Sequence, residues 1–171
     1  MEENEILIKK AKELRIQGKY QESLKILEEL YNNSPHSDRI EKDLIETLFS
    51  YGGALNDEYV LEYKKAKDMF KRIIEIKPNN YRAHYNLGIA YFNLGKLEKA
   101  KKAYEVALEI KPEYKHCYYN IGLIYESIGD FEHAILQYEK ALKIDPNFIY
   151  ALQARNHIRN LIDHLKLQSS K

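Results

Sequence analysis

The chain has 171 residues, of which 44% are hydrophobic and 31% are charged, and its formal net charge at pH 7 is +1. This length and composition suffice for one domain with its own core. The nearly balanced charge argues against the dense basic surface of nucleic-acid-binding proteins, so we expect no nucleic-acid partner. No apolar run approaches the roughly 20 residues of a membrane-spanning helix, so we expect no membrane span.

The N-terminus and the cysteine content favour a cytoplasmic protein. Residues 1–5 are acidic and lead into an amphipathic stretch, whereas a secretory signal begins with basic residues and continues as an apolar block. Cys117 is the single cysteine of the sequence, so no disulfide can form within the chain. Both features are typical of cytosolic proteins.

The prolines reveal an internal repeat. Pro78, Pro112 and Pro146 are each 34 residues apart, and Pro35 precedes Pro78 by 43 residues. The same spacing of 34 relates glycines, alanines and aromatic residues, namely Gly88 and Gly122; Ala66, Ala100 and Ala134; and Phe70, Tyr104 and Tyr138. Several unrelated side chains in one phase indicate a repeated structural unit.

Each 34-residue unit is predicted to be two helices joined by a tight turn. Gly88 and Ala100 are small enough to let the two helices approach closely, and Tyr104 fills the space around that contact. Gly95 suits the turn, where a helix end favours a positive φ. Pro112 ends the second helix because proline cannot continue the helical hydrogen-bond ladder.

These residues resemble the tetratricopeptide repeat, whose pattern is W-x2-L-G-x2-Y, then A-x3-F, then P. The tryptophan position holds His84 in one unit and Tyr118 in the next, which departs from the pattern. The resemblance implies an all-α fold, a right-handed α-solenoid of four helix pairs followed by a C-terminal capping helix. It covers residues 4–167, which is nearly the whole chain.

The repeat phase divides the chain. We expect repeats at 4–37, 38–80, 81–114 and 115–148, a capping helix at 149–167 and a frayed tail at 168–171. The apolar stripe of the last helix would cover the exposed end of the solenoid.

The second repeat carries a nine-residue insertion between 53 and 65. Gly18 and Gly52 are 34 residues apart, whereas Ser23 and Ala66 are 43 apart. We interpret residues 51–55 as a loop and expect one long helix from about 57 to 76, whose first turns project beyond the stack. The insertion is either a length variant or an added contact surface for a partner.

The resemblance implies a protein-interaction module or scaffold that binds a peptide segment of a partner in its concave groove. In the family, the first helix of each repeat lines that groove. Transferring the groove positions to this sequence gives Lys12, Arg39, Lys42, Arg82, Tyr85, Asn86, Ile89, His116, Tyr119, Asn120, Leu123, Tyr150 and Gln153.

The chemistry of these residues suggests the kind of ligand. Asn86 and Asn120 can donate to and accept from a peptide backbone. Tyr85, Tyr119 and Tyr150 would form an aromatic row with apolar faces and hydroxyl groups. The four basic residues lie towards the N-terminal half, which favours a peptide with an acidic end.

A chaperone-binding carboxylate clamp is one alternative that the family offers. The clamp positions of this sequence, counted from the second repeat, match the clamp at two of five places. Glu46 stands where the clamp has an amide and would repel a carboxylate. The five residues are Lys42, Glu46, Asn86, His116 and Asn120.

Self-association is the other alternative. Ile6, Leu7 and Ile8 make the first helix more apolar than a solvent-facing end should be. Solenoids can stack end to end when a terminus is poorly covered, so we expect a homodimer through this end as one outcome.

No catalytic or metal centre is predicted. The sequence contains no His-Glu-x-x-His motif and no glycine-rich phosphate loop. His157 and His164 are seven residues apart, but no third ligand is evident. Cys117 and His116 diverge by about 100° on a helix, so they do not make a nucleophile–base pair. We therefore expect no enzyme activity, no metal and no cofactor.

Overall fold

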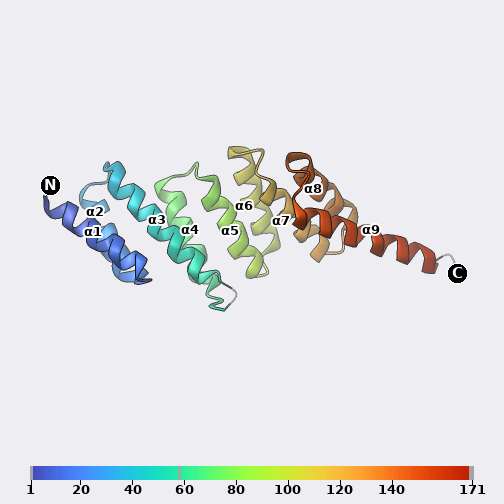
Figure 1. Ribbon diagram of the computed structural model, residues 1–171, viewed down its shortest axis with the longest axis horizontal. Helices are drawn as coiled ribbons and strands as arrows, with labels where there is room; N and C mark the ends of the chain where they lie inside the picture. The colour runs from blue at the N-terminus through green and yellow to red at the C-terminus, as the bar shows by residue number, and fades with distance from the viewer. Residues whose placement is uncertain (1, 58, 170–171) are drawn as a thin grey trace.

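The protein is an elongated stack of α-helices. The computed structural model describes residues 2–57 and 59–169, in which no strand occurs, and the side chains of residues 2 and 165–169 are left out of the description (Figure 1). The helices are α1 (Glu2–Ile16), α2 (Tyr20–Asn33), α3 (Asp38–Leu55), α4 (Tyr63–Ile76), α5 (Tyr81–Asn93), α6 (Leu97–Ile110), α7 (Lys115–Ser127), α8 (Phe131–Ile144) and α9 (Ile149–Ser169).

Each helix packs mainly on its neighbours in the chain. Contacts join α1 to α2, α2 to α3 and so on to α9, and α1 also contacts α3. The two ends of the chain lie at opposite ends of the stack (Figure 1). This nearest-neighbour packing confirms the predicted all-α solenoid of helix pairs followed by a C-terminal helix. Within the described ranges, no helix is both long and apolar enough to cross a membrane.

A glycine facing a buried ring closes the second, third and fourth helix pairs. Gly88 on α5 lies against Tyr104 on α6, and Gly122 on α7 lies against Tyr138 on α8, so closely that a Cβ at either glycine would overlap the ring. Tyr104 and Tyr138 are 1% and 0% exposed. In the second pair a Cβ at Gly52 would lie 2.8 Å from the ring of Phe70.

The turns within three pairs use glycine for its backbone freedom. Gly18, Gly95 and Gly129 have φ values of 75°, 68° and 78°, in the left-handed region that other residues avoid. Each follows the first helix of its pair and accepts the chain reversal there. The predicted role of Gly95 is therefore confirmed.

The second pair differs from the prediction. α3 continues through Gly52 and Gly53 to Leu55, and α4 begins at Tyr63. The loop expected at 51–55 and the long helix expected at 57–76 are therefore wrong. α3 has 18 residues where α5 has 13, and the connection 56–62 has seven where the connection 94–96 has three, so five extra residues extend α3 and four lengthen the connection.

The backbone conformation of the connection between α3 and α4 explains why α4 begins at Tyr63 and not near residue 57. The backbone N–H of Tyr59 donates to the Asp57 carboxylate at 2.9 Å, a local turn that competes with a helical bond. Leu61 has φ 55°, which also interrupts a right-handed helix. α4 consequently has 14 residues, the same length as α2, α6 and α8.

α9 packs on α8 and then extends beyond it (Figure 1). Ala151 and Ile158 on this helix are both 0% exposed, so its first turns cover the end of the stack. Two of the residues expected to fray, 170 and 171, lie outside the described residues.

Alanine substitutions at two helical glycines test the close packing. Gly88→Ala is expected to lower the free energy of unfolding by about 1–3 kcal/mol, because the new methyl group must displace the buried ring of Tyr104. Gly53→Ala is the matched control: nothing lies within 4 Å of a Cβ there, so the higher helix propensity of alanine should raise the free energy by up to about 1 kcal/mol. Urea unfolding followed by circular dichroism measures both. Two shifts of the same sign would contradict the packing argument.

Candidate peptide-binding groove

The predicted groove residues lie in one line along the stack. Side-chain contacts join the first helices of successive pairs: Lys12 on α1 to Asp43 on α3, and Asn120 on α7 to Tyr85 on α5. Further contacts join α5 to α3 and α7 to α9 through ring interactions. The structure therefore brings residues from α1, α3, α5, α7 and α9 together, although they span 142 positions in sequence.

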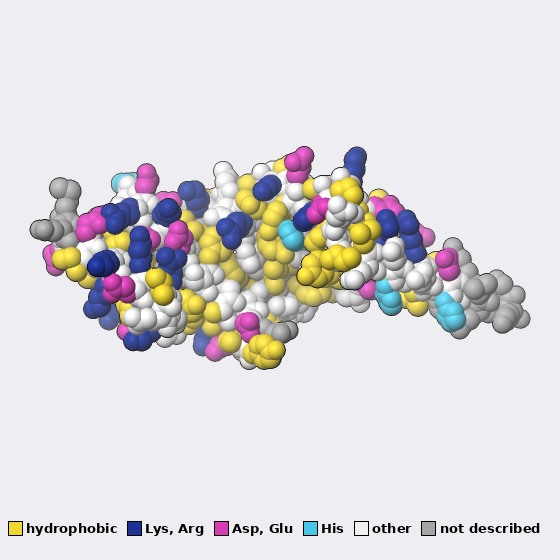
Figure 2. Space-filling model, in the orientation of Figure 1, with side chains coloured by type: hydrophobic (Ala, Val, Ile, Leu, Met, Phe, Trp, Pro, Cys, Tyr) yellow, Lys and Arg dark blue, Asp and Glu magenta, His cyan; other side chains and the backbone are white. Residues whose placement is uncertain are grey.

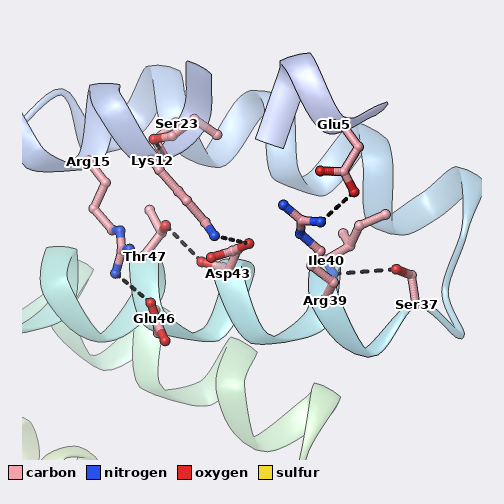
Figure 3. A network of polar contacts seen from close by, with 11 residues as sticks. Glu5, Lys12, Arg15, Ser23, Ser37, Arg39, Ile40, Asp43, Glu46 and Thr47 are labelled. Atoms are coloured by element: carbon pink, nitrogen blue, oxygen red, sulfur yellow. Dashed lines mark hydrogen bonds and ion pairs between the residues drawn. The ribbon is translucent and has the colours of Figure 1, made fainter. Parts of the chain in front are cut away.

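Ion pairs fill the N-terminal part of this line (Figure 3). The Lys12 ammonium lies 3.1 Å from the Asp43 carboxylate, whose residue is only 3% exposed. Arg39 pairs with Glu5 in the same way, again between α3 and α1. A buried carboxylate needs such a partner because burial of an unpaired charge is costly. Two of the four basic residues predicted to attract an acidic ligand are thus engaged within the fold.

The other two basic residues, Arg82 and Lys42, differ in whether they have a partner within the fold. The Arg82 guanidinium lies over the ring of Phe49, 5.3 Å from its centre, in a cation–π contact. Lys42 is exposed and, among the described residues, makes no ion pair or hydrogen bond. It lines a surface depression of about 510 Å³ whose wall carries the basic Lys77 and the acidic residues Asp38, Glu41 and Glu46. The depression is therefore of mixed charge.

The two amides keep part of their hydrogen-bonding capacity. The side-chain NH2 group of Asn86 donates to the Arg82 carbonyl at 2.7 Å, and that of Asn120 donates to the Tyr85 hydroxyl at 3.3 Å. Each amide also has a second N–H and a carbonyl oxygen. Within the described part of the chain these remaining groups have no partner, so they can pair with a peptide backbone.

Aromatic rings form a continuous cluster from α5 to α9. Ring centres are 5.1 Å apart between Tyr85 and Tyr114, 5.2 Å between Tyr114 and His116, and 5.1 Å between His116 and Phe148. These are edge-on and tilted contacts within the favourable range for aromatic pairs. We call this set the aromatic cluster; it consists of Tyr81, Tyr85, Tyr114, His116, Tyr119, Phe148 and Tyr150.

Sequence reasoning missed Tyr114 and Phe148. They lie in the turns that precede α7 and α9, outside the first-helix positions from which the groove was predicted. They are nevertheless 34 residues apart, so the repeat spacing itself could have identified them.

The aromatic cluster is electrically neutral near pH 7 and only partly accessible. Burial raises the pKa of Tyr85 to about 12 and also raises that of Tyr119. Burial and the neighbouring Lys115 lower the pKa of His116, which keeps its imidazole uncharged. Tyr85 and Tyr119 serve mainly as packing between repeats, whereas Tyr150 is 60% exposed and presents its ring to solvent.

The remaining candidate residues form the sides of the line. Ile89 and Leu123 are half-buried against the cores around Tyr104 and Tyr138, and Gln153 is exposed. Figure 2 shows the resulting contrast on one face: charges of both signs gather over the N-terminal helices, and hydrophobic side chains extend over the middle and the α8 end.

The exposure of the apolar residues on α1 is relevant to the predicted self-association. Ile6 is 66% exposed, whereas Ile8 is 3% exposed and packs with Leu30 and Ile40. Part of the apolar surface at this end is thus buried within the fold. Homodimerisation through this end stays a prediction.

Among the described residues, neither Cys117 nor a cluster of metal-ligating side chains forms a candidate site. Cys117 is 0% exposed, and burial raises the pKa of its thiol to about 12. Both properties are typical of a small packing residue. Across residues 2–57 and 59–169, no group of three or more His, Cys, Asp or Glu side chains is placed to hold a metal ion.

Alanine substitutions distinguish a lysine that is paired within the fold from one that is not. Lys12→Ala should lower the free energy of unfolding by roughly 1–2 kcal/mol, because it leaves the Asp43 carboxylate buried without its partner, a cost reduced by the partial exposure of the lysine. Lys42→Ala should change it by less than about 0.5 kcal/mol. Chemical denaturation gives both values. Equal losses would show that the Asp43 pair contributes nothing specific.

Comparison with known proteins identifies the repeat. Residues 81–147 match the sequence model of the tetratricopeptide repeat. No curated protein sequence matches the chain significantly.

Solved structures extend the likeness over the other helix pairs. A crystal structure of MamA superposes with a TM-score of 0.71 at 25% identity, covering 94% of this chain and 83% of MamA. The Sgt2 TPR domain from Aspergillus fumigatus gives 0.64 at 26% identity, covering 71% and 81% of the two chains. The first TPR of Spaghetti (RPAP3), bound to the HSP90 peptide SRMEEVD, gives 0.63 at 23% identity, covering 70% and 93%.

The sequence match, the helix-pair geometry and these structural neighbours agree. Residues 81–147 are tetratricopeptide repeats in sequence, and the fold of the chain as a whole is that of a tetratricopeptide-repeat solenoid.

Proposed function

We propose that the chain is a non-catalytic protein-interaction module whose groove binds an extended segment of a partner protein. The observation that carries this proposal is the aromatic cluster, which runs over the third and fourth helix pairs to α9 and is joined to Asn120 through Tyr85. An amide that recurs every 34 residues can follow the backbone of an extended peptide. The adjoining rings offer apolar contact to its side chains.

The C-terminal half of the groove should contribute most of the binding free energy. Lys12 and Arg39 are already paired, so their charge is largely neutralised before any ligand arrives. Tyr150 is exposed and in contact with Phe148 and Tyr119, which makes a site for one aliphatic or aromatic side chain. An acidic group of the ligand would pair with Lys42 at the rim of a depression that also carries three carboxylates, so this contact contributes little, and the peptide lies along the helix stack between Lys42 and Tyr150.

The solved neighbours support peptide binding as a class. The RPAP3 domain was solved with an HSP90 peptide in place, on a fold that this chain shares. The fold alone does not determine the ligand, so the peptide chemistry has to come from the residues of this chain.

The residues do not favour a carboxylate clamp. Glu46 carries a negative charge at a clamp position and pairs with Arg15 at 2.9 Å. His116 lies in the aromatic cluster with a lowered pKa, so it offers no cation near pH 7. We therefore propose an apolar ligand with an acidic group rather than a chaperone C-terminus.

Affinity capture with a paired variant tests the groove. Asn86→Ala combined with Asn120→Ala removes two backbone contacts and should weaken a groove-bound partner roughly tenfold, since each hydrogen bond contributes about 0.5–1.5 kcal/mol. Partners captured by the wild type and lost by the variant, identified by mass spectrometry, are groove ligands.

The control uses exposed asparagines away from the groove. Asn32→Ala with Asn33→Ala changes the same residue type on α2, the second helix of its pair, and should retain every partner. If the groove variant also retains every partner, the proposed groove is wrong.

A further inference from the structure

A second surface feature lies on the third repeat, away from the groove. It is a slot between α5 and α6 with a volume of about 210 Å³. We call it the α5–α6 slot; its floor is apolar and consists of Leu87, Tyr91, Ala103 and Val106. Residues advance by about 100° around an α-helix, which places Leu87 and Tyr91 roughly opposite Arg82 and Asn86. The slot therefore faces away from the predicted peptide groove.

The fourth repeat shows why this slot is open. The residues 34 positions later cover the equivalent place with their own side chains: the Lys140 ammonium lies 5.9 Å from the ring centre of Tyr118, and His133 stacks on Tyr125 at 5.2 Å. In the third repeat Val106 stands where Lys140 does, and it is too short to reach across.

Two further differences enlarge the opening. His84 replaces the larger Tyr118, and its ring nitrogen Nε2 lies 2.8 Å from the Pro78 carbonyl oxygen, which holds the ring at the edge of the slot. Ala103 stands where the fourth repeat has Gln137, and its shorter side chain leaves the slot deeper. These residues distinguish the third repeat from the fourth at the slot.

The rim of the slot is basic. Lys99 and Lys102 line it, and no carboxylate does. Neither lysine forms an ion pair or hydrogen bond within the described part of the chain, in contrast to Lys101 between them, whose ammonium donates to the Tyr125 hydroxyl at 2.6 Å. The slot therefore combines apolar surface with two available positive charges.

The size of the slot limits its ligand. Small-molecule sites usually enclose about 300–1,000 Å³, so 210 Å³ is suited to one side chain and not to a cofactor or an acyl chain. A nucleic-acid backbone would engage the lysines but leave the apolar floor uncovered.

We propose that the α5–α6 slot docks a segment of a partner protein that carries one leucine-sized side chain flanked by carboxylates. The apolar side chain covers Leu87, Ala103 and Val106, and the carboxylates pair with Lys99 and Lys102. This contact is independent of the groove, so the chain can hold one partner at two places or two partners together.

A peptide titration followed by NMR tests the proposal. The probe is Ac-Glu-Glu-Leu-Glu-Glu-NH2, added to the ¹⁵N-labelled full chain, with Ac-Glu-Glu-Ala-Glu-Glu-NH2 as the matched control. The leucine peptide should shift the amides of the slot residues Leu87, Tyr91, Lys99, Lys102, Ala103 and Val106, with a Kd of roughly 1 mM or tighter. The alanine peptide should bind about tenfold more weakly, because it leaves the floor exposed.

A variant that transplants the fourth repeat closes the slot. Ala103→Gln with Val106→Lys should weaken the leucine peptide about tenfold, although it adds a positive charge. Nonspecific attraction between charges would instead strengthen binding. Lys99→Gln with Lys102→Gln removes the rim charges without filling the slot and should also weaken binding, which keeps the test decisive if the filled variant does not fold.

Four outcomes would overturn the proposal. These are equal binding of the two peptides, unchanged or tighter binding to the filled variant, shifts confined to the groove residues, and the same slot shifts on concentrating the chain without peptide. The last would show that a second copy of the chain occupies the slot. Asn120→Ala, which alters the groove alone, should leave the peptide affinity unchanged.

Discussion

The close approach of two helices at a glycine is the contact on which the rest of the structure depends. Gly88 and Gly122 have no Cβ, and the rings of Tyr104 and Tyr138 occupy the space that a side chain would take. Because the contact repeats after 34 residues, α5 and α7 hold the same relation to their partner helices. The faces of these two helices then align, and Tyr85 comes within hydrogen-bond distance of Asn120, which lies 35 residues later.

Charge and apolar surface are distributed unevenly along the stack of helices. The N-terminal pairs use their charges for each other: Lys12 pairs with the buried carboxylate of Asp43, and the more exposed pair of Arg15 with Glu46 contributes little to stability. The C-terminal pairs bury aromatic rings between repeats and leave Tyr150 exposed at the end. The stack therefore has a polar surface of mixed charge at one end and an apolar surface at the other.

The repeat spacing predicted most of the fold, because a recurring glycine, alanine or proline has the same physical role at each recurrence. The same reasoning failed at Gly52 and Gly53, which we expected in a loop and which lie within α3. Glycine lowers helix propensity by only about 1 kcal/mol, and packing against Phe70 outweighs it. The turn at Asp57 depends on one side-chain hydrogen bond that the spacing does not reveal.

The groove residues stay a prediction from the family positions, and the contacts that they make within the fold could not be predicted. Family positions named the groove residues, yet they could not show that Lys12 and Arg39 are paired across helices, since those contacts depend on how one repeat is oriented on the next. The α5–α6 slot was also beyond prediction. It arises where Val106 is too short to make a contact that Lys140 makes in the following repeat, and missing contacts are visible only in three dimensions.

Native-state hydrogen exchange measures most directly whether the glycine–tyrosine contacts hold the structure together. The account predicts that amides beside these contacts, such as Ala90, Ala107, Ile124 and Ala141, exchange only through the largest opening of the molecule, with similar free energies. Amides of α1 should exchange through smaller, local openings. Greater protection in α1 than in α5–α8 would contradict the central role of these contacts.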